Sequence, residues 1–195
     1  MNQALQHPGA PGQVLQIGLP AWLSEAVSAD RNYPDEAAKV GLAIALARRN
    51  VEERSGGPFG AVIFDPEGRV VAAGVNRVLP EACSAAHAEL LAMIGAQRRL
   101  GRSRLNGNGR RYVLATSAQP CCQCYGACVW AGIDELLIGA RAEDVMELSE
   151  FDEGPLPADW VGELEARGIA VQRDILRDAA REVFSLYARL GGPHY

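Results

Sequence analysis

Two short motifs carry side chains that are able to hold a metal ion and to move protons. Residues 87–89 read His-Ala-Glu at the predicted start of one helix, and residues 120–124 read Pro-Cys-Cys-Gln-Cys at the start of another. His87, Cys121 and Cys124 offer one nitrogen and two sulfur ligands, a set that suits the tetrahedral coordination of zinc. The two cysteines stand at i and i+3 on a first helical turn, where free N–H groups and the positive end of the helix dipole favour thiolates.

Three protein ligands leave the fourth position of a zinc ion to water, which is typical of a catalytic site. Zinc lowers the pKa of such a water from about 15.7 toward about 7. Glu89, two residues after the first ligand, is placed to take the proton from this water and to return protons to a leaving group. The two motifs in this order match the H-x-E…P-C-x-x-C pattern of zinc-dependent nucleobase deaminases.

Two other interpretations of these residues stay open. A structural zinc site would replace the water with a fourth protein ligand, for which Cys122 and Cys128 are the candidates. Cys128 lies one turn beyond Cys124, and a compact helix makes it difficult for both to reach the same ion together with His87. In a metal-free protein the cysteines would be core residues, because free cysteine is often simply buried.

Length and composition predict a globular protein of one domain with an extension. The chain has 195 residues, of which 48% are hydrophobic and 22% charged, and its net charge is −5. These values exclude whole-chain disorder, collagen-like repeats and coiled coil, and the acidic balance argues against a nucleic-acid coat protein or a polybasic membrane binder. We expect residues 1–30 to form an N-terminal arm and residues 31–195 to form the functional domain.

The cysteines and the N-terminal residues indicate a cytoplasmic protein without a membrane partner. Five cysteines, three of them at positions 121, 122 and 124, make a poor disulfide framework, so we expect reduced thiols. Residues 1–18 have neither the charged nor the apolar region of a secretory signal. No run of the sequence approaches the roughly 18 apolar residues of a membrane-spanning helix.

Strands and helices alternate along the rest of the chain, and they must position these motifs. Apolar residues at helical spacing predict helices over residues 20–29, 35–54, 86–100, 121–131, 159–166 and 175–190. Short apolar runs predict strands over residues 59–64, 70–75, 111–116, 133–138 and 169–172, the first two forming a hairpin. This order implies a mixed sheet covered by helices on both faces.

Charge is distributed unevenly over these elements. Residues 98–111 contain six arginines and no acid, whereas residues 134–165 contain eleven acids opposed only by Arg141. The arginine run is typical of a solvated helix C-terminus and loop, which also suits the helix dipole. A nucleic-acid-binding face is the alternative interpretation of the same run.

On these motifs the chain resembles the cytidine deaminase superfamily, and within it the bacterial guanine deaminase branch. The resemblance covers residues from about 35 to 195 and is carried by residues 56–63, 76, 86–89, 120–127, 130, 151–153 and 194–195. It implies a three-layer α/β/α sandwich with a mixed five-stranded sheet and one zinc ion per subunit. It also implies conversion of guanine to xanthine and ammonia, with Glu89 moving protons.

The resemblance further implies which residues contact the nucleobase: Phe59, Asn76, Ala88, Trp130 and Tyr195. An Asn76 amide offers one acceptor and two donors to a purine edge, although asparagine also favours turns. Phe59 would stack on the base or belong to a strand core. Trp130 would wall the pocket or pack as a helix residue.

A second carboxylate and the end of the chain complete the implied site. Glu153 would share the proton transfers with Glu89, or would be one exposed acid in an acidic stretch. In the branch that the chain resembles, the C-terminal segment is exchanged within a homodimer, so Tyr195 would cover the partner's active site while His194 passes nearby. Gln119 departs from the family, which commonly has glutamate beside the proline.

Other functions remain compatible with the sequence. The same chemistry would serve another aminated heterocycle, such as guanosine or the s-triazine ammeline. A tRNA adenosine deaminase would use the arginine run, although the net charge of −5, Trp130 and the C-terminal tail oppose it. A non-catalytic zinc-binding module is the third hypothesis.

Overall fold

A computed structural model describes residues 16–28, 31–193 and 195, and these form a mixed five-stranded sheet in the order β2-β1-β3-β4-β5. β1 pairs antiparallel with both β2 and β3, whereas β3, β4 and β5 run parallel. The predicted hairpin and the mixed sheet are therefore confirmed. The strands are β1 (Gly60–Phe64), β2 (Val70–Val75), β3 (Val113–Ala118), β4 (Glu135–Ala140) and β5 (Ala170–Gln172).

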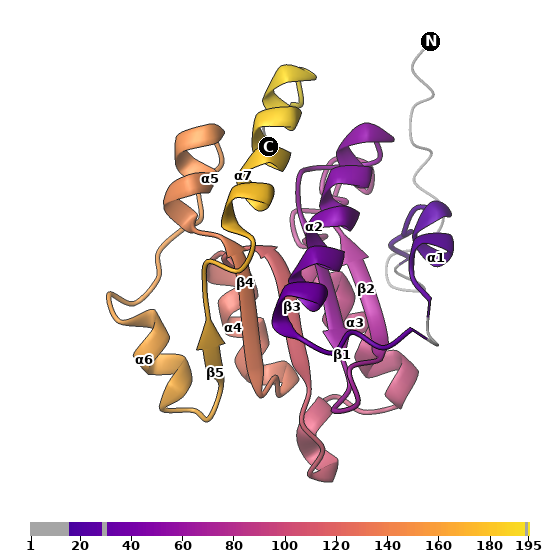
Figure 1. Ribbon diagram of the computed structural model, residues 1–195, viewed down its shortest axis with the longest axis vertical. Helices are drawn as coiled ribbons and strands as arrows, with labels where there is room; N and C mark the ends of the chain where they lie inside the picture. The colour runs from indigo at the N-terminus through magenta and orange to yellow at the C-terminus, as the bar shows by residue number, and fades with distance from the viewer. Residues whose placement is uncertain (1–15, 29–30, 194) are drawn as a thin grey trace, which may run out of the picture.

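Helices cover both faces of this sheet and confirm the three-layer α/β/α architecture (Figure 1). One face packs against α2 (Glu36–Glu52), α5 (Ala142–Leu148) and α7 (Arg177–Arg189). The other face packs against α3 (Ala88–Leu100), α4 (Cys122–Ala131) and α6 (Trp160–Glu165). Each predicted helix is present, and each end lies within a few residues of its predicted position.

Burial on both sides explains why the strands are continuously apolar. Successive side chains of a strand point to opposite faces. Val62 and Phe64 accordingly belong to the core beneath α2 and α7, while Ala61 and Ile63 belong to the core beneath α3 and α4. All four side chains are fully buried, so this central strand has no solvent-facing side.

A glycine lets the sheet approach the helix that carries the first motif. A Cβ atom on Gly74 of β2 would lie 2.2 Å from the carbonyl oxygen of Ala88, at the start of α3. Such a distance is far below van der Waals contact, so only glycine permits this close packing. The contact places the first turn of α3, with His87 and Glu89, directly over the end of β2.

The structure also contains two elements that the sequence did not predict, α5 and the 3₁₀-helix η1 (Leu105–Asn108). β3 and β4 each begin two residues later than predicted. Asp134 explains the shift, because its side chain accepts a hydrogen bond from the backbone N–H of Tyr112 over 2.8 Å. This bond ties together the two turns that precede the strands.

The expected N-terminal arm lies partly outside the described residues, which omit 1–15 and 29–30. The helix α1 (Trp22–Ala26) packs on the body of the protein, where Leu23 is buried in the core. The indole of Trp22 donates a hydrogen bond to Ser55 over 3.1 Å. Among the described residues, no helix is both long and apolar enough to cross a membrane.

Candidate active site

The two motifs meet at the start of two helices and line one cavity of about 110 Å³. His87 is the N-cap residue of α3, and Cys121 is the N-cap residue of α4. Both helix N-termini therefore direct free N–H groups and positive dipole ends toward the cavity. The lining residues are Phe59, Asn76, His87, Glu89, Gln119, Cys121, Phe151, Asp152, Glu153 and Tyr195.

His87, Cys121 and Cys124 have the geometry of a zinc site. Their ligand atoms all lie within 4.8 Å of one another. The Nδ1 atom of His87 is 3.4 Å from the Sγ atom of Cys121 and 3.6 Å from that of Cys124. A nitrogen and a sulfur bound to one tetrahedral zinc ion at ordinary bond lengths are about 3.6 Å apart. The three residues consequently fit zinc without rearrangement.

The two cysteines share one proton in the absence of a metal. The hydrogen bond from Cys124 lowers the pKa of Cys121 to about 4, and the bond to His87 adds to this effect. The same hydrogen bond, together with burial, raises the pKa of Cys124. One thiolate is thus already favoured at neutral pH, as a cation-binding site requires.

Cys122 and Cys128 do not join this cluster. Cys128 is fully buried in the core beneath α3 and α4, and burial raises the pKa of its thiol. Cys122 is exposed on the outer side of α4. Among the described residues the metal cluster consists of three ligands, which leaves a position for water or substrate.

Two buried carboxyl groups face this cluster. Glu89 is 5% exposed and Glu153 is 8% exposed. Burial, together with the charge of Cys121, raises the pKa of Glu89 to about 7 and the pKa of Glu153 to about 8. Groups with pKa values near neutrality can both accept and donate protons during a reaction.

The loop that carries Glu153 is fastened to the second motif. The backbone carbonyl of Glu153 accepts a hydrogen bond of 2.9 Å from the backbone N–H of Cys122. The next residue, Gly154, has a φ of +67°, and a Cβ atom there would lie 2.6 Å from the Sγ atom of Cys122. A glycine is therefore needed where the loop leaves the cavity.

Asn76 and Phe59 also line the cavity. Asn76 is 2% exposed, and its Oδ1 atom accepts a hydrogen bond from the backbone N–H of Val78 over 3.2 Å. Within the described part of the chain, no hydrogen bond is recorded for its Nδ2 donors, so they are available to a ligand. Phe59 makes edge-to-face contacts with Phe151 and Phe184, each with ring centroids 5.4 Å apart.

Tyr195 enters the cavity of its own chain. Its ring centroid is 4.8 Å from that of Phe151, and its hydroxyl lies 2.0 Å from where a Cβ atom on Gly57 would stand. Burial raises the pKa of the Tyr195 hydroxyl. His194 lies outside the described residues.

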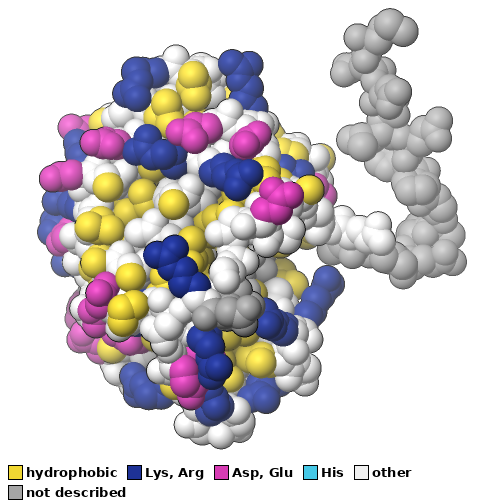
Figure 2. Space-filling view, turned by 45° about the vertical axis from the view of Figure 1, so that its right-hand side comes forward, with side chains coloured by type: hydrophobic (Ala, Val, Ile, Leu, Met, Phe, Trp, Pro, Cys, Tyr) yellow, Lys and Arg dark blue, Asp and Glu magenta, His cyan; other side chains and the backbone are white. Residues whose placement is uncertain are grey.

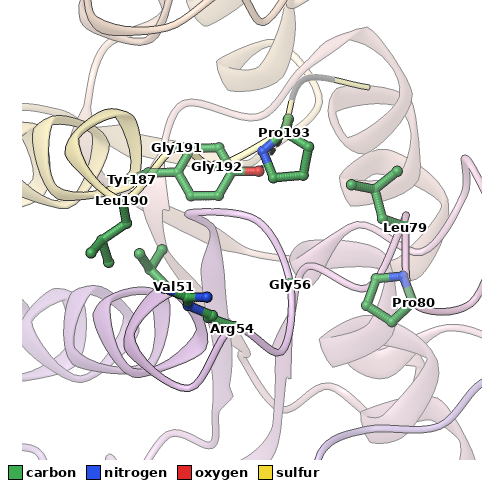
Figure 3. A pocket seen from close by; sticks show the side chains of 10 residues that line it. All are labelled: Val51, Arg54, Gly56, Leu79, Pro80, Tyr187, Leu190, Gly191, Gly192 and Pro193. Atoms are coloured by element: carbon green, nitrogen blue, oxygen red, sulfur yellow. Dashed lines mark hydrogen bonds between the residues drawn. The ribbon is translucent and has the colours of Figure 1, made fainter.

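The segment before Tyr195 leaves α7 and runs along one side of a second cavity of about 330 Å³ (Figure 3). The hydroxyl of Tyr187 donates a hydrogen bond to the carbonyl oxygen of Pro193 over 2.5 Å. This bond holds Pro193 against the last turns of α7.

Two residues expected to contact substrate do not line the cavity. Trp130 is 79% exposed and is not among the residues that line this cavity, so its contact with substrate stays a prediction. It follows Cys121 by nine residues, which at about 100° per residue places it on the opposite side of α4. The side chain of Ala88 is fully buried in the core, so a substrate contact from its backbone stays a prediction.

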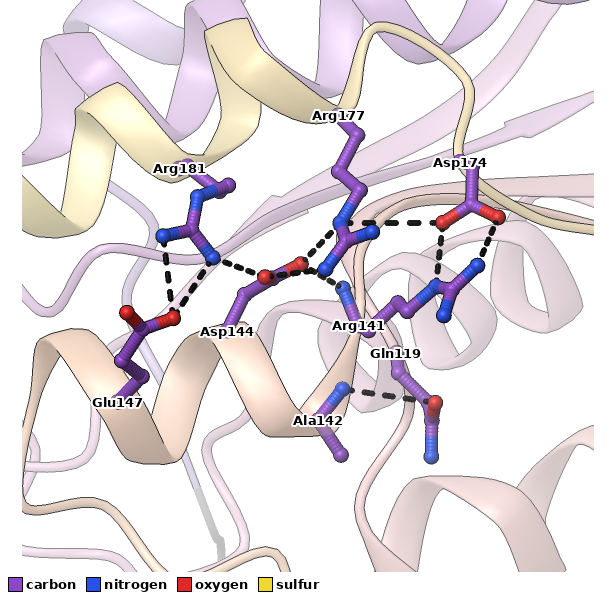
Figure 4. Close-up of polar contacts among 8 residues, drawn as sticks. All are labelled: Gln119, Arg141, Ala142, Asp144, Glu147, Asp174, Arg177 and Arg181. Atoms are coloured by element: carbon purple, nitrogen blue, oxygen red, sulfur yellow. Dashed lines mark hydrogen bonds and ion pairs between the residues drawn. The ribbon is translucent and has the colours of Figure 1, made fainter.

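Gln119 and Asn50 support the cavity in ways that the sequence analysis missed. Gln119 lines it, and its side-chain oxygen lies 3.5 Å from the backbone nitrogen of Ala142 (Figure 4). Asn50 is fully buried and donates hydrogen bonds to the carbonyl oxygens of Gly57 and Asn76 over 2.8 and 2.9 Å. Asn50 lies within the apolar stripe of α2, and a polar residue at such a position could have indicated this supporting role.

Comparisons with known proteins place the chain in one zinc-binding deaminase family. The family described as the cytidine and deoxycytidylate deaminase zinc-binding region matches residues 34–140. The guanine deaminase of Bacillus subtilis is 37% identical over 111 residues, which are 57% of this chain and 67% of that protein.

Two solved structures extend the similarity over nearly the whole chain. The guanine deaminase from Nitrosomonas europaea is 43% identical, with a TM-score of 0.87, over 93% of this chain and 100% of that one. A mutant of the protein NE0047 in complex with 8-azaguanine is also 43% identical, with a TM-score of 0.86, over 90% of this chain and 98% of that one.

Proposed function

The chain belongs to the family that contains the cytidine and deoxycytidylate deaminase zinc-binding region, and we propose that it is a zinc-dependent guanine deaminase. The reaction is guanine plus water to xanthine plus ammonia. The observation that carries this proposal is the placement of a zinc-ligating triad and two buried carboxyl groups around one small cavity. Two of the relatives described above are guanine deaminases, and the one from Nitrosomonas europaea shares the fold over 93% of this chain.

His87, Cys121 and Cys124 would hold the zinc ion, which when bound lowers the pKa of a water molecule in its fourth position. Glu89 accepts a proton from the attacking water and delivers protons to the ring and to the leaving ammonia. Glu153 is the second proton carrier, because its pKa near neutrality lets it donate as well as accept. The oxygen of water bonds to C2 of guanine while the neighbouring ring nitrogen gains a proton, and the bond from C2 to the protonated amino nitrogen then breaks to release ammonia.

The dimensions of the cavity favour a free base over a nucleoside or an RNA. Its volume of about 110 Å³ lies well below the roughly 300–1,000 Å³ of typical ligand pockets. Asn76 would present its Nδ2 donors to the purine carbonyl, while Phe59 would contact the ring. A ribose attached to the base would have to displace Tyr195, which lines the same cavity.

We also propose an oligomeric state and a cellular compartment for this enzyme. The protein is a homodimer of the cytoplasm that serves purine metabolism, with residues 31–195 as the catalytic domain. Its C-terminal segment is exchanged between subunits, so that Tyr195 closes the cavity of the partner. The five free cysteines support a reducing compartment.

Ammonia release from a panel of substrates tests the proposed function. Zinc-loaded protein is incubated with guanine, guanosine, ammeline, cytosine and adenosine-containing tRNA, and we expect turnover of guanine above all the others. Absence of xanthine formation at high enzyme concentration would overturn the proposal. Faster turnover of another compound in the panel would show that this compound, and not guanine, is the substrate.

A pair of variants then separates an enzyme from a zinc-binding module. Glu89→Gln should keep its zinc and lose activity by about 10²- to 10⁴-fold, because the proton carrier is gone. Glu163→Gln, an equal change on the exposed face of α6, serves as the control and should retain full activity. Equal activity of the two variants would remove Glu89 from the mechanism.

A further inference from the structure

A third cavity, of about 460 Å³, lies at the end of the sheet opposite the candidate active site. Asp65 follows the last residue of β1 and lines this cavity, whereas Phe59 precedes the first residue of β1 and lines the catalytic cavity. Six residues of extended chain at about 3.3 Å each separate the two cavities by about 20 Å. The third cavity therefore plays no part in the proposed reaction.

Arginine dominates the lining of this third cavity. Arg69, Arg99, Arg102 and Arg110 surround it, and Asp65 is the only acid among the residues that line it. Three of these arginines belong to the run at residues 98–111 noted in the sequence. Lys and Arg side chains gather at the lower end of the molecule in Figure 2, where Figure 1 shows the connection between α3 and β3.

Two of the four arginines have acidic partners and two have none. Arg69 pairs with Asp65 and Glu67, and Arg110 also pairs with Glu67. Within the described part of the chain, no ion pair is recorded for Arg99 or for Arg102. Arg99 donates only to a neutral acceptor, the carbonyl oxygen of Val71, over 3.0 Å.

Arg102 carries the observation that points to a ligand. Its Nη1 atom is buried from solvent and has no hydrogen-bond partner among the described residues. A buried donor left without an acceptor costs about 1–3 kcal/mol, and more when it is charged, so such atoms normally have a partner. The cavity that Arg102 lines carries excess positive charge, because Asp65 and Glu67 pair with only two of its four arginines among the described residues.

We propose that this arginine-lined cavity binds a phosphate-bearing anion, either inorganic phosphate or the phosphate group of a nucleotide. Guanidinium groups bind phosphate oxygens through paired N–H donors, and several arginines around one site suit a multiply charged anion. The net charge of −5 on the whole chain opposes a long polyanion such as RNA but leaves this local site positive. The proposal does not depend on the identity of the deaminase substrate.

Calorimetric titration of the zinc-loaded, full-length protein tests this site. Inorganic phosphate and adenosine 5′-monophosphate are titrated separately at constant ionic strength into the wild type and into Arg102→Gln, Arg110→Gln and Arg98→Gln. Arg98 belongs to the same arginine run and is exposed but lies outside the cavity, so Arg98→Gln controls for the general loss of one positive charge. Thermal melting without phosphate checks the folding of each variant, and Arg110→Gln replaces Arg102→Gln if the latter does not fold.

We expect saturable binding of at least one of the two anions to the wild type. Arg102→Gln and Arg110→Gln should each weaken it by about tenfold or more, and Arg98→Gln should leave it within about twofold. Tighter binding of the nucleotide than of phosphate would support the proposal with a nucleotide as the source. No saturable binding of either anion, or equal weakening by all three variants, would overturn it.

Discussion

Cys124 and Cys128 lie one turn apart on α4 and are both fully buried, yet they face different surroundings. Cys124 is 3.6 Å from the Nδ1 atom of His87, whereas Cys128 packs among the apolar residues beneath α3. The spacing of Cys121 and Cys124 and the preceding proline made these ligands predictable from sequence, because a first helical turn fixes their relative positions. The same helical geometry places Trp130, nine residues after Cys121, on the opposite side of α4.

Zinc content separates the two buried cysteines. Cys124→Ala should lose nearly all of its zinc, because two ligands do not hold the ion as three do. The matched Cys128→Ala change should retain one zinc per subunit and lose about 1 kcal/mol of stability from the small cavity that it leaves. Metal analysis of the purified proteins, with chemical denaturation alongside, provides the measurement. Equal zinc loss in both variants would show that Cys128 is a ligand.

Gly57 offers a way to remove the Tyr195 side chain from the cavity without altering Tyr195. A Cβ atom at Gly57 would lie 2.0 Å from the Tyr195 hydroxyl oxygen, so Gly57→Ala should expel the ring. The tail is a chain end and can move away, so we expect activity to fall strongly while the melting temperature changes little. Steady-state rates on guanine and thermal melting would measure this.

Deletion of Tyr195 provides the check on that interpretation. If Gly57→Ala acts through Tyr195, deletion of Tyr195 should add little further loss of activity in the Gly57→Ala background. Fully additive losses in the double variant would mean that Gly57→Ala damages the cavity in another way, for instance through Asn76, whose Oδ1 atom would lie 3.1 Å from the new Cβ.

At the scale of elements, α7 is held against α5 by one buried carboxylate (Figure 4). The Asp144 side chain is 1% exposed and accepts two hydrogen bonds of 2.7 Å from Arg177 and a further bond from Arg181. It also accepts a bond of 2.9 Å from the backbone N–H of Arg141 at the start of α5. Because α7 leads into the C-terminal tail, this cluster fixes the element from which Tyr195 is delivered.

Replacement of Asp144 should destabilise the fold in a pH-dependent way. The bonds from Arg177 hold the pKa of Asp144 below its ordinary value. The Asp144 carboxylate stabilises the fold fully at pH values above about 4, which is the pKa of an aspartate in the unfolded chain. This stabilisation is lost as the pH falls toward the lower pKa that Asp144 has in the folded protein. Asp144→Asn should therefore cost on the order of 3 kcal/mol at pH 7, and the difference from wild type should shrink below about pH 4.

A second aspartate supplies the matched control for that prediction. Asp174 pairs with Arg141 over 2.6 Å, but the two side chains are 37% and 36% exposed. An exposed pair contributes less than about 1 kcal/mol, so Asp174→Asn should have a small effect at pH 7. Urea denaturation of both variants from pH 3 to pH 7 compares them. A loss in Asp144→Asn no larger than in Asp174→Asn would contradict the anchoring role.

The elements themselves were predictable where the apolar pattern was long and regular. α2 and α3 follow clear helical spacing, and the hairpin is bounded by turn residues. The helix α5 was missed because Ala142–Leu148 has seven residues, and charged side chains occupy much of it. Its start is closed by a local hydrogen bond from the backbone N–H of Arg141 to Asp144, but arginine is not one of the residues that commonly mark an N-cap. Gln119 and Asn50 were missed for another reason, because their hydrogen bonds join segments distant in sequence.

At the scale of the whole molecule, the proposed exchange determines which subunit's tail closes which cavity. The structure of one chain places Tyr195 in its own cavity, against Phe151 and beside Gly57. Exchange of the tail between two subunits would make the same contacts with the partner's copies of these residues. The turn at Gly191, with a φ of +66°, and the bond from Tyr187 to Pro193 set the direction of the tail. These local contacts are compatible with either connection, so the assembly has to be tested directly.

A mixed dimer distinguishes the two arrangements. One subunit carries Glu89→Ala with an intact tail, the other carries an intact Glu89 without residues 194 and 195, and different affinity tags allow the heterodimer to be isolated. Each parent homodimer should be nearly inactive. With an exchanged tail, the intact tail closes the cavity that retains Glu89, so the heterodimer should recover about half of the wild-type activity per dimer. With a tail that serves its own chain, one site lacks Glu89 and the other lacks its lid, and activity should stay at the level of the parents. Gel filtration of the tail-deleted protein, which should remain a folded, zinc-containing dimer, excludes loss of assembly as the cause.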